Sequence, residues 1–212
     1  MRLYDFWSSS AAYRVRIGLA LKGLAYERVV INRLNGVEEP GYEAVNPQRF
    51  VPTLEVGGRR LHQSLAILEY LDERHPEPPL LPRDAEGRAR VRAIAGMVAC
   101  DVQPLNNQRV QDALLADFGL GPAGLQRWYE RWIGEGFAAL ERLLADSPET
   151  GRFCHGDTPT LADACLVPQV FNARRWRCDL EPYPTIRRID AACRDLPAFQ
   201  AAAPERQPDC PE

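Results

Sequence analysis

Three consecutive serines, Ser8, Ser9 and Ser10, are the residues of this chain best placed to do chemistry. They precede a segment, 12–24, whose apolar residues recur every three or four positions, which predicts an α-helix. A hydroxyl at a helix N-terminus can accept a backbone hydrogen bond as an N-cap. It can also donate one to an anion that the helix dipole stabilises. Both roles, capping and stabilisation of an anion, are open for Ser9 and Ser10.

The cysteines and histidines do not indicate a metal or redox centre. No two cysteines have the Cys-x-x-Cys spacing of a dithiol or a zinc site, and no two histidines lie at the spacing of one helix face. We therefore expect no metal, and we expect reduced thiols that serve mainly as small apolar side chains. The residues concerned are Cys100, Cys154, Cys165, Cys178, Cys193 and Cys210, with His62, His75 and His155.

The serines would be positioned by an α/β unit in the first 80 residues. Apolar periodicity and turn residues predict the order strand, helix, strand, strand, strand, helix, in which the first two strands are parallel. Gly57-Gly58 marks a hairpin, and Ser64 can cap the last helix. The expected ranges are 3–7, 12–24, 26–31, 51–56, 59–62 and 65–73.

The rest of the chain reads as helical. Four prolines between positions 76 and 82 are typical of a linker. Beyond them we expect helices at 88–101, continuing towards 116, and at 123–145, 161–174, 182–193 and 197–203, followed by an extended tail. The sequence thus predicts a domain at 1–80, a linker at 81–86 and an all-helical domain at 87–212.

Composition excludes several classes of protein. The chain of 212 residues has 26 basic and 29 acidic residues without a long run of either sign, so we expect no binding of nucleic acid. No apolar stretch reaches the roughly 20 residues of a membrane span, so we expect no contact with a membrane. The first residues do not resemble a signal peptide, which predicts a cytoplasmic protein.

Short segments spread over nearly the whole chain resemble zeta-class glutathione transferases. Each is weak alone, and their order and spacing carry the resemblance. They are SSAAYRVRI from Ser9, Asn46-Pro47, VPTL from Val51, HQSLAI from His62, QPLNN from Gln103 and QPD from Gln207.

The resemblance implies a thioredoxin-like N-terminal domain with a cis Val51-Pro52 bond, joined to the helical domain of glutathione transferases. It implies a homodimer that uses glutathione as a cofactor. The implied activity is cis–trans isomerisation of a small diketo dicarboxylate, maleylacetoacetate or maleylpyruvate, in the breakdown of aromatic compounds. A thiolate would add to the double bond, the resulting single bond would rotate, and elimination would restore glutathione.

The resemblance also assigns residues by position. Ser9 would be the first choice for activating the thiol and Ser10 the second. The glutathione contacts would come from Ser9, Ser10, Ala11, Arg14, Val51, Pro52, Gln63, Ser64, Gln103, Asn107 and Arg109. Substrate carboxylates would meet Ser8, Arg14, Arg109, Arg174 and Arg175.

Two positions depart from the family pattern. Ala11 replaces a frequent Cys, and Ser8 stands where related isomerases commonly have Arg. Two other functions stay open. One is a glutathione transferase or α-haloacid dehalogenase that uses the same thiolate; the other is a non-catalytic interaction module.

Overall fold

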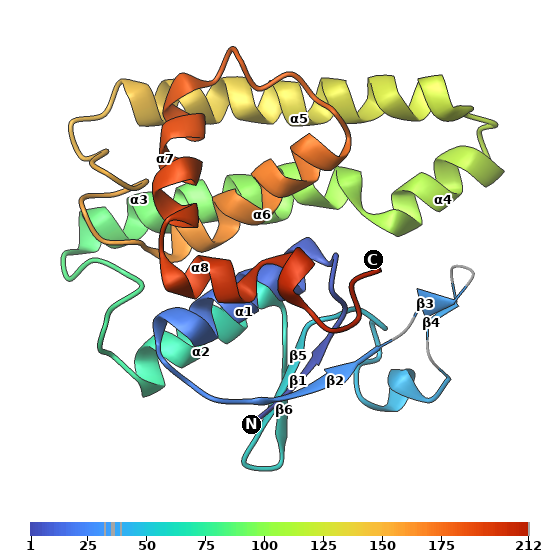
Figure 1. Ribbon diagram of the computed structural model, residues 1–212, viewed down its shortest axis with the longest axis horizontal. Helices are drawn as coiled ribbons and strands as arrows, with labels where there is room; N and C mark the ends of the chain where they lie inside the picture. The colour runs from blue at the N-terminus through green and yellow to red at the C-terminus, as the bar shows by residue number, and fades with distance from the viewer. Residues whose placement is uncertain (32, 35–36, 39, 212) are drawn as a thin grey trace. The chain divides into compact units, whose positions relative to one another are not determined.

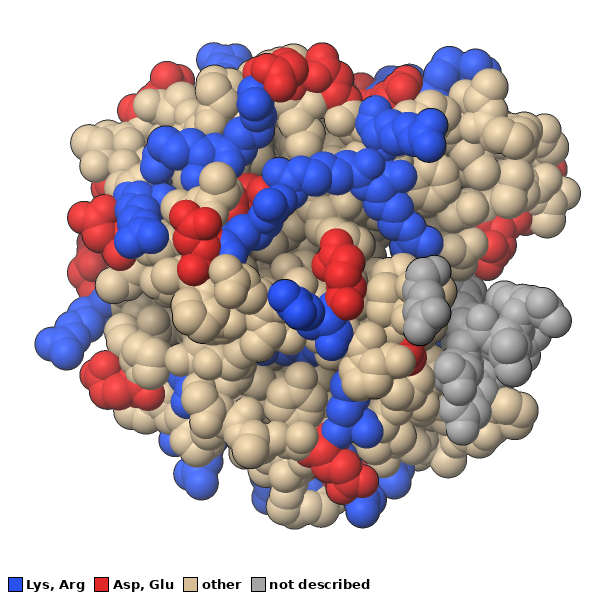
Figure 2. Space-filling view, in the orientation of Figure 1, with Lys and Arg blue, Asp and Glu red and all other residues tan. Residues whose placement is uncertain are grey.

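The computed structural model describes residues 1–31, 33–34, 37–38 and 40–211. It divides into two compact units, one of Met1–Leu80 with Arg194–Glu212 and one of Leu81–Cys193. Figure 1 shows the course of the chain through the helices and strands. On the face drawn in Figure 2, basic side chains stand among acidic ones.

A mixed four-stranded sheet organises the first unit. The strands β1 (Arg2–Asp5), β2 (Glu27–Val30), β5 (Thr53–Val56) and β6 (Arg59–His62) lie in the order β2-β1-β5-β6. The β1 strand is parallel to β2 and antiparallel to β5, and β5 is antiparallel to β6. A separate two-stranded ribbon consists of β3 (Arg33–Leu34) and β4 (Val37–Glu38). The predicted strands are therefore confirmed, with ends that differ by one or two residues.

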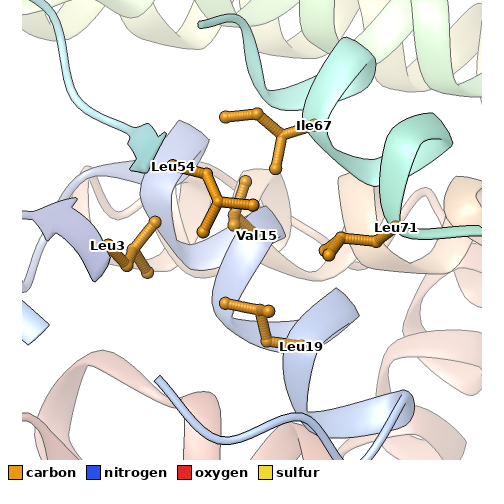
Figure 3. Close-up of a cluster of buried hydrophobic side chains, with 6 residues drawn as sticks. All are labelled: Leu3, Val15, Leu19, Leu54, Ile67 and Leu71. Atoms are coloured by element: carbon orange, nitrogen blue, oxygen red, sulfur yellow. The ribbon is translucent and has the colours of Figure 1, made fainter. Parts of the chain in front are cut away.

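Two helices bury one face of this sheet. Side chains from β1, α1 (Ser10–Leu21), β5 and α2 (Ser64–Arg74) meet in one apolar cluster (Figure 3). The α1–α2 contact is tight, because a Cβ on Gly18 would lie 2.2 Å from Cδ2 of Leu68. The cluster comprises Leu3, Val15, Leu19, Leu54, Ile67 and Leu71, each fully buried.

The second unit is built from helices, and its first helical segment differs from the prediction. We expected one helix from 88 towards 116, but α3 (Ala85–Gly96) passes into a π-helical turn, Met97–Val102, and a 3-10 turn, Gln103–Asn106, before α4 (Gln108–Ala116) begins. Pro104 lacks the backbone N–H that a continuous helix needs. Asn107 then starts α4 as its N-cap, with its side chain accepting from the Arg109 N–H at 3.1 Å.

The remaining predicted helices are present as α5 (Pro122–Ala145), α6 (Leu161–Arg175), α7 (Pro184–Arg194) and α8 (Pro197–Ala202). A capping box opens α6. Asp163 accepts from the Thr160 N–H at 2.7 Å, and the Thr160 hydroxyl accepts from the first turn of α6. In the part of the chain that the structure describes, every helix is too short or too polar to cross a lipid bilayer.

The C-terminal segment belongs to the first unit, although the sequence assigned residues 87–212 to one helical domain. Helix α8 packs on α1, and the Arg16 Nε donates to the Ala202 carbonyl at 2.9 Å. The expected extended tail is also different, because Pro204–Arg206 forms a 3-10 turn whose neighbour Gln207 donates to the Ala203 carbonyl at 2.9 Å. The Ala202 carbonyl thus supplies one of the acceptors that the buried Arg16 guanidinium needs.

Candidate functional site

Three of the predicted segments converge at one end of the sheet. In the antiparallel register, Tyr4 pairs with Thr53 and Thr53 pairs with His62. The end of β1, which leads into the serines, therefore lies beside Pro52 at the start of β5. Beside them lies the end of β6, which leads into Gln63 and Ser64.

Ser9 caps α1 and keeps its hydroxyl hydrogen for another partner. Its backbone is extended (φ −68°, ψ 115°), and its Oγ accepts from the Ala12 N–H at 3.2 Å. Because the cap uses the oxygen as an acceptor, the O–H can still donate to an anion in front of the helix. Capping and thiol activation are therefore compatible at Ser9. Ser10 is the first helical residue and, like Ser8, is half-buried.

The cis Val51-Pro52 bond is present as predicted. A second cis bond, Glu77-Pro78, lies in the proline-rich segment and was not anticipated. Pro52 is buried and Val51 is half-buried, so the backbone of Val51 borders the end of the sheet where the serines lie. The resemblance assigns Val51 and Pro52 to contacts with glutathione.

The start of α2 has the features of an anion site. Among the described residues, no side chain caps this helix, so its first N–H groups stay available to a ligand. Ser64 is buried and accepts from Nη1 of the buried Arg14 at 3.2 Å. The cation on α1 thus lies at the N-terminus of α2, where a carboxylate would be held by both.

Gln63 has an uncommon backbone conformation immediately before α2. Its φ of 69° lies in the left-handed region, which non-glycine residues rarely adopt. Its exposed side chain donates from Nε2 to Oε1 of Gln48 at 2.7 Å. Gln48 was missed by the sequence analysis, because it lies in a polar segment without a pattern that points to Gln63.

Together these groups fit glutathione, a peptide with a thiol and two carboxylates. The α1 N-terminus offers a hydroxyl donor, and the α2 N-terminus offers N–H groups beside the buried Arg14 guanidinium. Ala11 lies half-buried in the first turn of α1, next to the serines.

Three further predicted residues lie in the second unit, around the start of α4. Gln103 is half-buried in the 3-10 turn before α4, and Arg109 is exposed in the first turn of α4. The Asn107 side chain is engaged in capping this helix.

Tyr129 on α5 connects α4 with the end of α6. Its hydroxyl lies 3.4 Å from the Asn106 carbonyl oxygen and 3.3 Å from Oε1 of Gln111. Its ring stacks on the ring of Trp176, with 3.8 Å between the ring centroids. Burial raises the pKa of Tyr129 to about 12, although the nearby Arg175 guanidinium opposes the rise. The phenol is therefore protonated near neutral pH, and Arg175 lies close to it. No pattern in the sequence indicates this role of Tyr129.

Arg174 and Arg175 differ in their surroundings. Nη2 of Arg174 lies 2.6 Å from Oδ2 of the buried Asp190 on α7, so its charge already serves the packing of α6 against α7. Arg175 is exposed and lies near Tyr129. Both arginines are exposed at the end of α6. Within the described ranges, no group of three or more His, Cys, Asp or Glu side chains could hold a metal ion.

Comparison with known proteins identifies the family. Residues 3–79 match the family model for the glutathione S-transferase N-terminal domain, and residues 122–205 match that for the C-terminal domain. The chain is 51% identical over 212 residues to a maleylpyruvate isomerase from a Ralstonia species, covering 99% of both chains. It is 50% identical over 205 residues to a maleylacetoacetate isomerase from Rhizobium meliloti, covering 96% of both.

A solved structure is similarly close. The maleylacetoacetate isomerase of Anaeromyxobacter dehalogenans, with glutathione bound in its active site, superposes with a TM-score of 0.88 at 51% identity, covering 99% of this chain and 97% of that one. Both the sequence segments and the fold agree with these proteins over the full length. The structure of a maleyl pyruvate isomerase described as a bacterial glutathione S-transferase of the zeta class superposes with a TM-score of 0.95 at 49% identity, covering 100% of both chains. The chain therefore belongs to the glutathione S-transferase family, in its zeta class.

Proposed function

We propose that this protein is a glutathione-dependent cis–trans isomerase of a maleyl diketo acid. The observation that carries the proposal is the capped α1 N-terminus, where the Ser9 oxygen accepts from Ala12 and its hydrogen stays free for a thiolate. The similarity to both maleylpyruvate and maleylacetoacetate isomerases supports the choice of reaction.

When bound, glutathione supplies a thiol whose anion adds reversibly to the substrate double bond. The ordinary pKa of such a thiol is about 8.5, so it needs stabilisation as an anion near neutral pH. Ser9 donates its hydrogen to the sulfur, and the α1 dipole adds positive potential. Ser10 is the second candidate for this donor.

The peptide part of glutathione would be held away from the reacting sulfur. We assign one of its carboxylates to the N–H groups of α2, with Ser64 and Arg14 beside them. Gln63 and the backbone of Val51 supply further hydrogen bonds. The resemblance also assigns Gln103 and Asn107 to glutathione. Because Arg14 is buried against Ser64, we assign it to glutathione rather than to the substrate.

The substrate carboxylates and the developing enolate need cations. Arg109 and Arg175 are exposed guanidiniums of the second unit that suit bidentate contacts with carboxylates. Ser8 replaces the Arg that is common in related isomerases, so we expect the substrate to depend more on these two. We further propose a cytoplasmic homodimer, for which light scattering should give twice the 23.8 kDa of the chain.

The test measures the decay of maleylacetoacetate and of maleylpyruvate, each with and without glutathione. We expect glutathione-dependent formation of the trans isomer from at least one of them. Binding of glutathione without turnover of either compound would overturn the isomerase assignment. Halide release from a haloacid, or an accumulating glutathione conjugate, would then establish the dehalogenase or transferase instead.

A further inference from the structure

The backbone of Trp7, two residues before Ser9, is held from both sides by charged side chains. Its N–H donates to Oδ2 of Asp209 at 3.1 Å, and its carbonyl accepts from Nη2 of Arg16 at 2.9 Å. Asp209 lies 202 positions further along the chain, in the QPD segment close to the C-terminus. The sequence alone indicates no function for that segment.

The two groups that hold Trp7 belong to one chain of alternating charges. Asp209 Oδ1 lies 2.6 Å from Nη1 of Arg28, Arg28 also pairs with Asp5, and Asp5 lies 2.7 Å from Nη1 of Arg16. The side chains of Asp5 and Arg16 are fully buried, and those of Arg28 and Asp209 are 13% and 14% exposed. Two acids and two bases balance each other, which is the condition for burying charges at tolerable cost.

This arrangement closes a ring around the turn that presents Ser9. The ring runs from the Trp7 N–H through Asp209, Arg28, Asp5 and Arg16 to the Trp7 carbonyl. The turn continues into the cap, because the Ser9 N–H donates to the Phe6 carbonyl at 3.0 Å. All members lie in the first unit, so the ring does not depend on how the two units are arranged.

We propose that Asp209 is a positioning residue for the thiol-activating hydroxyl of Ser9. The inference rests on the proposed function of Ser9. A donor to a reacting anion must be held to within a fraction of an ångström, and displacement by about 1 Å can cost 100-fold in rate. The C-terminal segment thus supplies a group on which the geometry of the active serine depends.

The experiment measures the pKa of the thiol of bound glutathione, from the ultraviolet absorbance of the thiolate, in wild type, Asp209→Ala and Asp209→Glu. Asp209→Ala should raise this pKa by about one pH unit and lower kcat about 10-fold or more. The dissociation constant of glutathione should change only a few-fold, because the α2 N-terminus holds the peptide. Asp209→Glu should restore part of the loss. The matched control is Glu205→Ala, an exposed acidic residue of the same segment, which should behave as wild type.

Two further variants separate the possible outcomes. Asp209→Asn keeps an acceptor for the Trp7 N–H but loses the ion pair with Arg28. It should therefore raise the thiol pKa as well, but by less than Asp209→Ala does. It carries the test if Asp209→Ala does not fold. Ser9→Ala, measured alongside, tests the proposed function itself. If Ser9→Ala raises the thiol pKa while folded Asp209 variants lower only the melting temperature, Asp209 is merely structural and the inference is wrong. If Ser9→Ala leaves the pKa unchanged, the role of Ser9 fails, and with it the inference.

Discussion

At the scale of residues, the chemistry of this site depends on how one hydroxyl divides its hydrogen-bonding capacity. The Ser9 oxygen accepts from the Ala12 N–H, which satisfies a group that the helix leaves without a partner. The hydrogen is not used by this cap and can point at an anion. A serine at this position thus stabilises the helix and stays available for catalysis, whereas alanine could do neither.

Ser9→Ala should therefore lower kcat while hardly changing the affinity for glutathione. Losing one donor to a reacting anion costs on the order of 100- to 1,000-fold in kcat. The glutathione dissociation constant should stay within a few-fold, and the lost cap should cost about 1 kcal/mol of stability. Steady-state kinetics and glutathione titration check these effects, with Ser10→Ala as the matched control. A silent Ser9→Ala with an inactive Ser10→Ala would show that the neighbouring hydroxyl acts on the sulfur.

Arg109 and Arg175 should bind the maleyl substrate rather than glutathione. Replacing either by Ala is expected to raise KM for the maleyl diacid about 10-fold or more while the glutathione dissociation constant is unchanged, because hydrogen bonds to charged groups contribute about 1.5–3 kcal/mol. Arg131→Ala is the control, since this arginine is 67% exposed and paired with Glu135. Weaker binding of glutathione in either variant would place that arginine at the cofactor instead.

At the scale of elements, much of the architecture follows from the sequence because it depends on local signals. The Gly57-Gly58 hairpin, the Thr160–Asp163 capping box and the strand-helix alternation all lie within a few residues of chain. The π-helical turn before Gln103 has no local signal beyond Pro104. The contact between Asp209 and Trp7 spans 202 positions, and no periodicity in either segment indicates it.

The N-cap of α3 should make stability depend on pH. Asp84 accepts from the Gly87 N–H at 2.6 Å, and this hydrogen bond is the main reason that the pKa of Asp84 is lowered from 3.8. A carboxyl group whose pKa is lower in the folded state stabilises the folded protein when the pH is above the pKa of the unfolded state. This stabilisation is lost as the pH falls through the pKa of the folded state. Wild type should therefore exceed Asp84→Ala in unfolding free energy above about pH 5, and the charge-dependent part of the difference should shrink below pH 3.8. If the difference in unfolding free energy between wild type and Asp84→Ala does not change with pH, the charge of Asp84 is not its cause.

Lys22 should be essential for joining the end of α1 to the segment after α2. Its buried ammonium donates to Oδ1 of Asp72 at 2.6 Å and to the carbonyls of His75 and Pro78. Lys22→Met leaves the Asp72 charge largely buried without its partner, which should cost about 3–5 kcal/mol in urea unfolding.

The double variant Lys22→Met/Asp72→Asn is the control for that prediction. Asparagine removes the charge but keeps an acceptor for the Leu80 N–H, which Asp72 binds at 2.7 Å. The double variant should therefore be more stable than Lys22→Met alone. If it is less stable, the ion pair is not the reason for the loss.

At the scale of the whole molecule, the chain follows its relatives from end to end. The resemblance predicted both domains, the glutathione cofactor and the type of reaction, because the motifs are spread over the full length. It could not choose between the two maleyl substrates, since the discriminating pocket depends on packing between segments far apart in the sequence.

If glutathione is a recycled cofactor, one molecule of it supports many turnovers, so the stoichiometry of the reaction is decisive. Purified protein is given a cis-maleyl diketo acid in large excess over glutathione, and both the trans product and the free thiol are quantified over time. We expect many equivalents of trans isomer per glutathione, with the thiol recovered unalkylated because elimination restores it. Product formation that stops after one equivalent, with the thiol consumed, would contradict it.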